Sequence, residues 1–450
     1  MAMNPSISRA WRVATAVALA WLLVPAHGAL CLDLATALAL ARANDAGFRA
    51  DVLEARARHA TGWSRIASMG PRGTVSARAM RSRLDYAPDS EAEAGDRDLT
   101  FSDSELNLLV EQPLLDMEKI YTARRGRCEM EIAALERVKA DEELFVRVVE
   151  RYFGFLTARD EVALARAKLA FLTRQLETAR AGHELGLGDQ SDLYDIQGRY
   201  QGTRAALALL EARLVDARAA LVEVLGQELT GEVEMVDLER VFPGPGHDIG
   251  HWLRQAEKNN IDLRLSLARA EAARLDGRII TGRFLPALSM YVEYGHNSPD
   301  NDSIGYGWDR DRTDFGLRLQ MEFLSGGRDL ADVVARDRTY RAARQRAIAV
   351  RRSVRRQTRA NWNSLQRTLE SIRFYREAVA ANEKSLRIKE AGYQEGLQTM
   401  LDVLNVQKDY FAAKNDYQKA RNNYAITWAS FMQIAGNLAE IRKRLHYSLP

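Results

Sequence analysis

Apolar residues recur at every seventh position over two long stretches of the chain. One stretch contains Val148, Phe155, Val162, Leu169 and Leu176, and the other contains Leu365, Ile372, Val379, Leu386 and Tyr393. A sustained seven-residue period is typical of helices that pack as a left-handed coiled coil. Each stretch is followed by a glycine-bearing segment and a second apolar series of the same period, so the pattern predicts two antiparallel helical hairpins. Their turns are expected near 182–190 and 392–400, at Gly182, Gly186, Gly392 and Gly396.

Four shorter segments alternate apolar and polar residues, which is the pattern of a β-strand. The predicted strands cover about 73–83, 101–112, 286–296 and 313–323. One side of the second pair is apolar and contains Leu288, Val292, Leu317 and Leu319, whereas Arg318 and Gln320 lie on the other side. Polar loops at 85–99 and 296–312 join the strands of each pair. Loops of this length are unusual in soluble hairpins and common on the outward side of outer-membrane strands.

The chain is an internal duplication. Residues 181–200 align with 391–410 without a gap, and the identical pairs include Gly182 with Gly392 and Asp192 with Asp402. Further upstream the same similarity continues at a slightly larger offset. We therefore predict a first structural repeat at 29–240 and a second at 241–450. Each repeat contains helices, a strand, a loop, a second strand, a very long helix, a turn and a final helix.

The first residues have the layout of a secretory signal peptide. Arg9 and Arg12 precede an apolar stretch at 13–24. Small residues occupy the −3 and −1 positions of a cleavage site after Gly28. Residues 1–28 are therefore predicted to be removed on export. Cys31 follows Leu30, whereas a lipidated cysteine normally follows a small residue, so lipidation of Cys31 is not expected.

Charge and hydropathy exclude two classes of protein. The 64 Lys and Arg residues nearly balance the 61 Asp and Glu residues, which leaves no basic excess for a dedicated nucleic-acid binder. No run of 18 apolar residues follows the signal peptide, which excludes a bundle of transmembrane helices. Four strands are too few to close a barrel, and open strand edges are not viable in lipid. If the strands lie in a membrane, the chain must therefore oligomerise: two copies would give eight strands and a filled barrel, and three would give twelve strands and a pore.

Together these features resemble the TolC-like outer-membrane efflux family, over essentially the whole mature chain. The similarity rests on the duplication, on the turns AGHELGLGDQSDL and AGYQEGLQTMLDVLN, and on FLPALSMYVEYG, QPLLD and FLSGG next to the strands. The resemblance implies a mainly α-helical fold with a transmembrane β part. Duplicated helical hairpins would form a trimeric periplasmic tunnel below a twelve-stranded barrel embedded in outer-membrane lipid. Such proteins are passive exit ducts for type I secretion or tripartite efflux, and they dock onto a periplasmic adaptor and an inner-membrane transporter.

Carboxylates near the hairpin turns narrow the periplasmic entrance in the family. Asp402 matches the first such position of the second repeat, and Asn405 replaces the second, while the first repeat offers Asp192 and Asp195. Residues three apart share a helix face, so each pair would form rings of three in a trimer, and an acidic ring attracts cations. The alternative is that these residues cap helix N-termini, as Ser191 and Asp192 are suited to do. A further departure from the family is Glu322, at the strand-to-helix junction where the first repeat has Pro113.

No motif indicates catalysis, so we predict no enzymatic activity, cofactor or metal. Gly186-Leu187-Gly188 lacks the preceding strand of a nucleotide loop. His247 and His251 lack carboxylate or cysteine partners for a metal, and the arginine-rich run at 336–359 suits a solvated or partner-facing helix. The rival interpretation is a secreted or periplasmic coiled-coil interaction protein without a pore, which would have no use for the strands. Missing lipidation and the short segment after Gly436 favour type I secretion over drug or metal efflux.

Overall fold

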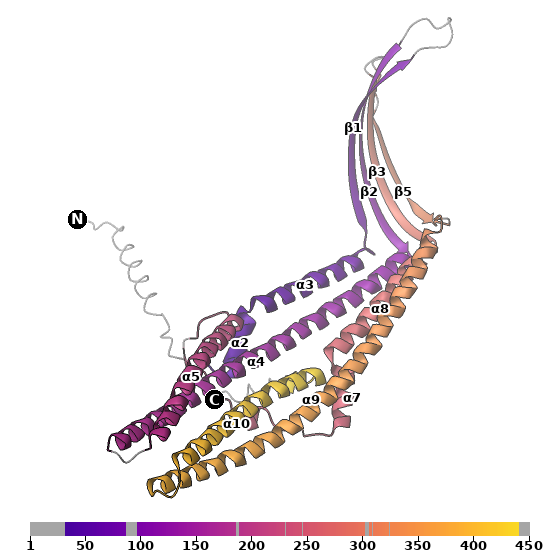
Figure 1. The fold of residues 1–450 in the computed structure, drawn as a ribbon. Helices are drawn as coiled ribbons and strands as arrows, with labels where there is room; N and C mark the ends of the chain where they lie inside the picture. Colours follow the sequence, from indigo (N-terminus) through magenta and orange to yellow (C-terminus); the bar gives the residue numbers. More distant parts are fainter. Residues whose placement is uncertain are drawn as a thin grey trace, which may run out of the picture.

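The computed structural model describes residues 32–86, 97–185, 189–229, 231–244, 246–301, 306–307, 309–323 and 325–440. The predicted signal peptide, Cys31 and Gly186 lie outside these ranges. The described chain is elongated, with a curved sheet at one end and two helical hairpins reaching away from it (Figure 1).

Helices dominate the described chain. They are α2 (Leu34–Asn44), α3 (Ala46–Ala67), α4 (Met117–Glu184), α5 (Gln190–Leu225), α6 (Leu238–Val241), α7 (Ile249–Asn259), α8 (Ile261–Gly282), α9 (Arg328–Gln394) and α10 (Met400–Ala435). At 1.5 Å per residue, the 68 residues of α4 and the 67 of α9 each extend about 100 Å. The predicted long helices and helical hairpins, α4 with α5 and α9 with α10, are therefore confirmed. No helix among the described residues is long and apolar enough to cross a membrane.

The helix boundaries recur at the offsets seen in the sequence. Helices α5 and α10 begin at 190 and 400, and both end before a left-handed glycine. Gly226 has φ of 66° and Gly436 has φ of 67°. A Cβ atom at either position would lie 2.6 Å from Asn44 or Asn259, at the C-terminal ends of α2 and α7. Glycine is thus required at both helix ends by backbone conformation and by close packing.

The strands form one antiparallel sheet in the order β1 (Arg72–Tyr86), β2 (Arg97–Leu115), β3 (Ala287–Asn301) and β5 (Arg310–Gln320). A two-residue strand, β4 (Tyr306–Gly307), pairs with the far end of β3 and was not predicted. The strand predicted at about 313–323 extends too far at its C-terminal end, because β5 stops at Gln320, before Met321 and Phe323. Gln320 pairs with Ala287, the first residue of β3. Pro286 precedes Ala287 and has no N–H to continue the ladder.

A large apolar core lies halfway along the hairpins, and we call it the waist. It joins α2, α4, α5, α6, α7, α9 and α10, and its largest buried side chains are Trp428, Tyr152, Phe145, Phe153, Phe242 and Phe431. The Tyr152 hydroxyl donates to the carbonyls of Leu32 at 3.0 Å and Glu234 at 2.6 Å. The Trp428 indole N–H donates to the Pro243 carbonyl at 2.6 Å. The connection between α5 and α7 is therefore held against both α4 and α10.

Candidate functional site

The ends of the hairpins farthest from the sheet carry the predicted entrance residues (Figure 1). An apolar cluster from all four long helices joins the two hairpins there. It contains Leu172, Leu176, Ile196, Leu386, Met400, Val403 and Leu404. We call this set the end cluster. It holds the α4–α5 turn beside the α9–α10 turn, so side chains from both repeats lie close together.

The turn glycines differ in role. Gly396 lies in the α9–α10 turn with φ of 75°, a conformation that favours glycine. Gly392 lies one turn earlier, inside α9, and its carbonyl accepts from the N–H of Leu397 at 2.7 Å. A Cβ atom there would approach Cγ of Gln398 to 2.8 Å. Gly182 lies in the last turn of α4 rather than in the turn itself.

Asp402 performs the capping role that was the alternative to an entrance role. Its carboxylate accepts from the Thr399 hydroxyl at 2.7 Å and from the Thr399 N–H at 3.2 Å, while its own N–H donates to the Thr399 hydroxyl. This is a reciprocal capping box at the start of α10. The Thr399 hydroxyl, its N–H and then the Lys389 ammonium lower the pKa of Asp402. The side chain therefore stays ionised and partly exposed.

Asp192 and Asp195 lie in the first turns of α5, but neither caps it. Asp189 is the N-cap and accepts from the Ser191 N–H at 3.0 Å. Burial, followed by the charges of Asp189 and Asp195, raises the pKa of Asp192. The three carboxylates thus lie near enough to repel one another. The negative charge of Asp192 also reaches across to α9, where it adds to the effect of burial in raising the pKa of Tyr393.

Asn405 takes part in a contact between the hairpins that the sequence analysis missed. The Arg199 guanidinium, on α5, donates to the Asn405 side-chain carbonyl at 3.2 Å and to the Leu404 backbone carbonyl at 3.4 Å. Arg199 directly precedes Tyr200, which belongs with Leu193 and Leu207 to the second apolar series of the first hairpin. Polar residues flanking a seam commonly bridge coiled-coil helices, so this position was the available signal. The structure therefore brings Arg199, rather than a second carboxylate, to Asn405.

The sheet has two chemically distinct faces. The strand register places one exposed apolar set on a single face: Val75, Leu106, Leu108, Val110, Met290, Val292, Tyr294, Phe315, Leu317 and Leu319. Leu288 pairs with Leu319 and shares this face. Arg318 and Gln320 lie on the opposite face, where the Arg318 guanidinium stacks over the Tyr291 ring at 4.6 Å. The apolar face is covered by nothing in the described chain.

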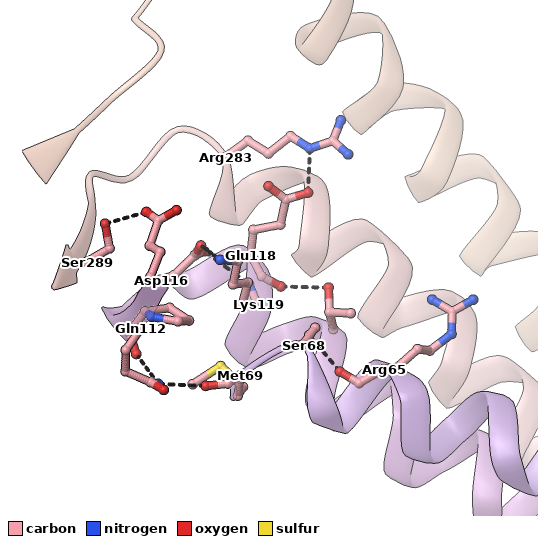
Figure 2. Close-up of polar contacts among 12 residues, drawn as sticks. Arg65, Ser68, Met69, Gln112, Asp116, Glu118, Lys119, Arg283 and Ser289 are labelled. Carbon is pink, nitrogen blue, oxygen red and sulfur yellow. Dashed lines mark hydrogen bonds and ion pairs between the residues drawn. The ribbon is translucent and has the colours of Figure 1, made fainter. Parts of the chain in front are cut away.

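The sheet meets the helices at a junction built from polar contacts (Figure 2). Arg283, just after α8, donates to Glu118 at the start of α4 at 2.9 Å and lies 3.7 Å from the carboxylate of Asp329 on α9. The Gln112 amide, on β2, donates to the Met69 carbonyl at 2.8 Å. Ser289 of β3 donates to Glu111 of β2 at 2.7 Å. These bonds set the direction in which α4 and α9 leave the sheet.

The comparisons with known proteins agree with this architecture. The family model described as outer membrane efflux protein matches residues 37–227 and 252–437. The chain belongs to the outer membrane efflux protein family. The outer membrane protein TolC of Vibrio cholerae is 29% identical over 300 residues, 66% of this chain and 68% of that protein. The alkaline protease secretion protein AprF of Pseudomonas aeruginosa is 26% identical over 430 residues, covering 94% and 88% of the two chains.

Solved structures show the same fold for this family member. The outer membrane channel CmeC of Campylobacter jejuni superposes with a TM-score of 0.77, covering 91% of this chain and 89% of that one at 14% identity. The second strand-to-helix junction has Glu322 where the first repeat has Pro113. Its carboxylate lies 3.6 Å from the Arg328 guanidinium, and Gly326 and Gly327 make the bend with φ of 62° and 85°. An ion pair and two glycines thus stand where Pro113 and the Asp116 cap stand in the first repeat.

Proposed function

We propose that this outer membrane efflux family member is a passive exit duct, assembled as a trimer with a twelve-stranded barrel and a continuous helical tunnel in the periplasm. The observation that carries the proposal is a sheet with four long strands and unpaired outer edges, joined directly to helices about 100 Å long. In the described chain, the outer edges of β1 and β5 pair with no other strand.

The topology favours closure between copies. The order β1-β2-β3-β5 is antiparallel throughout, so β5 of one copy can pair antiparallel with β1 of the next. Unpaired backbone groups cost several kcal/mol each in lipid, which drives the edges together. Two copies would give about eight strands, an interior filled by side chains, whereas three give twelve and leave a pore. Strands of 11 to 19 residues reach or exceed the roughly 9–11 residues needed to span a bilayer.

The two sheet faces support an assignment of lipid and lumen. The apolar face, with Leu288, Val292, Leu317 and Leu319, would contact the hydrocarbon, and the face with Arg318 and Gln320 would line the pore. Alternation of apolar and polar residues along each strand is the signature of outer-membrane barrels. A coiled-coil interaction protein without a pore has no use for such a sheet.

In a trimer, the entrance residues would converge on the three-fold axis. Asp192, Asp195, Asp402 and Asn405 would each form a ring of three at the periplasmic end. Asp402 serves this role while also capping α10, because one carboxylate can accept the cap bonds and attract a cation. The hairpin ends are also the surface we expect a periplasmic adaptor to contact, linking the duct to an inner-membrane transporter.

Protein secretion is the better-supported use of the duct. The AprF protein of Pseudomonas aeruginosa, whose alignment covers 94% of this chain, is named for secretion of an alkaline protease. We therefore propose a type I secretion role in preference to drug or metal efflux. Conduction requires no bond making, so no enzymatic activity is expected.

The test is to purify the protein from outer membranes in detergent and to determine its mass and conductance. We expect a trimer that forms channels in planar bilayers. A stable, water-soluble monomer that forms no channels would contradict the proposal.

A further inference from the structure

A basic groove runs along α4 between the waist and the end cluster. Its volume is about 620 Å³, and its walls come from α4, α5 and α10. The side chains that matter here are Lys168 on α4, Arg199 on α5, and Gln407 and Lys408 on α10. Leu172 and Leu404 of the end cluster form its lower boundary.

Cations gather in the groove without matching carboxylates. Burial, followed by the charges of Arg199 and Lys408, lowers the pKa of Lys168, so both cations act on the Lys168 ammonium. Glu161 is the one acidic side chain lining the groove, and its carboxylate lies 2.6 Å from Lys419. Arg199 bonds only the neutral oxygens of Leu404 and Asn405 among the described residues. Like charges held this close are stabilised by an anion between them.

A buried amide in the groove wall also lacks a partner. Gln407 is 1% exposed, and its Nε2 has no hydrogen-bond acceptor within the described part of the chain. An unsatisfied buried donor is costly, and native structures contain few of them. An acceptor group entering the groove would satisfy this donor, so the amide and the cations point to the same kind of ligand.

We propose that this groove is a binding site for a small oxyanion, of the phosphate or dicarboxylate class. Lys168, Lys408 and Arg199 supply the positive charge, and Gln407 supplies a neutral hydrogen-bond donor. Arginine and lysine together suit such a ligand, because the guanidinium fork fits two oxygens and the ammonium acts as a point charge. The proposal does not depend on conduction through the duct.

The test is isothermal titration of the full-length, detergent-purified protein with inorganic phosphate and, separately, with succinate, in a chloride buffer of constant ionic strength. We expect saturable binding of at least one of them, and the tighter of the two identifies the class. Lys168→Met and Lys408→Met should each weaken binding roughly tenfold, the effect of losing a charge-assisted hydrogen bond. Absence of saturable binding of both probes would overturn the proposal.

Two control variants separate a built site from general attraction to a basic surface. Lys384 on α9 is exposed and lies outside the groove, so Lys384→Met should bind as wild type. Gln407→Leu removes the buried donor without changing charge. It should weaken binding while leaving thermal stability equal or higher, because an unsatisfied polar group is replaced by an apolar one. Equal losses in Lys384→Met and Lys168→Met, or unaltered binding in Gln407→Leu, would contradict the site.

Discussion

Asp192 and Asp402 occupy equivalent positions of the two repeats but have opposite electrostatic surroundings. Asp402 receives hydrogen bonds from Thr399 and lies 4.0 Å from the Lys389 ammonium. Asp192 has the carboxylates of Asp189 and Asp195 nearby. The duplication predicts matching residues, but the pKa of each depends on the side chains that the turns bring beside it.

This difference predicts opposite responses to pH. A raised pKa in Asp192 means that its ionised form destabilises the fold, so stability is present at low pH and lost as pH rises through the folded pKa. Asp192→Asn should therefore raise the urea midpoint at pH 7.5, and the difference from wild type should vanish in acid.

The lowered pKa of Asp402 gives the reverse sign, with stability lost as pH falls through the folded pKa. Asp402→Ala should lower the midpoint at pH 7.5 and matter less in acid; equal shifts at both pH values would refute the assignments.

A second prediction at this scale tests the entrance ring. Carboxylates converging in threes should bind a divalent or trivalent cation added on the periplasmic side. Asp402→Ala should weaken the block of conductance by such cations in planar bilayers, whereas Asn405→Ala, which removes no charge, should alter it less. Unchanged block in Asp402→Ala, Asp192→Ala and the double variant would leave these residues as helix caps and electrostatic neighbours only.

At the scale of elements, the strands allow a matched comparison of the two sheet faces. Leu317 and Gln320 lie on the same strand but on opposite faces. Arginine on the lipid side costs about 2–4 kcal/mol at mid-bilayer, whereas a lumen position tolerates it. Leu317→Arg should therefore reduce the amount of assembled trimer in outer membranes far more than Gln320→Arg, as judged by unheated gel electrophoresis. Similar yields for the two variants would disprove the assigned facing.

The sequence predicts elements well where one period is sustained, as in α4, α9 and the apolar face of β5. It predicts boundaries less well where a partner decides them. Strand β5 ends at Gln320 because β3 begins after Pro286, and this depends on register rather than on the alternation at 321–323. The contact of Arg199 with Asn405 depends on how the two hairpins align, which no single helix pattern specifies. The sequence does not show in advance that Thr399 is the N-cap of α10 and Asp402 its partner, because the exact first residue of the helix decides which side chain caps it.

At the scale of the whole molecule, the waist unites the two repeats. Trp428 is 1% exposed and donates to the carbonyl of Pro243, in the segment between α5 and α7. The Tyr424 hydroxyl also donates to that carbonyl, at 3.2 Å. Trp428→Phe keeps an aromatic ring but removes one of these two hydrogen bonds, at a cost of about 0.5–1.5 kcal/mol. We expect a clear loss of thermal stability. Trp63→Phe, at a residue 63% exposed on α3, should change stability by less than about 0.5 kcal/mol; comparable losses would show that the waist bond contributes little.

The position of the waist also makes the middle of the molecule stiffer than the hairpin ends. Large aromatic side chains lock the middle of the molecule, whereas the hairpin ends are joined by a smaller set of aliphatic contacts and by the Arg199 bonds. Bending at the ends therefore breaks only local contacts and meets a stiff pivot before it reaches the sheet. If three copies assemble as proposed, the strand region should keep its diameter while the far aperture widens or narrows, and passage through the duct would be controlled without altering the part within the membrane.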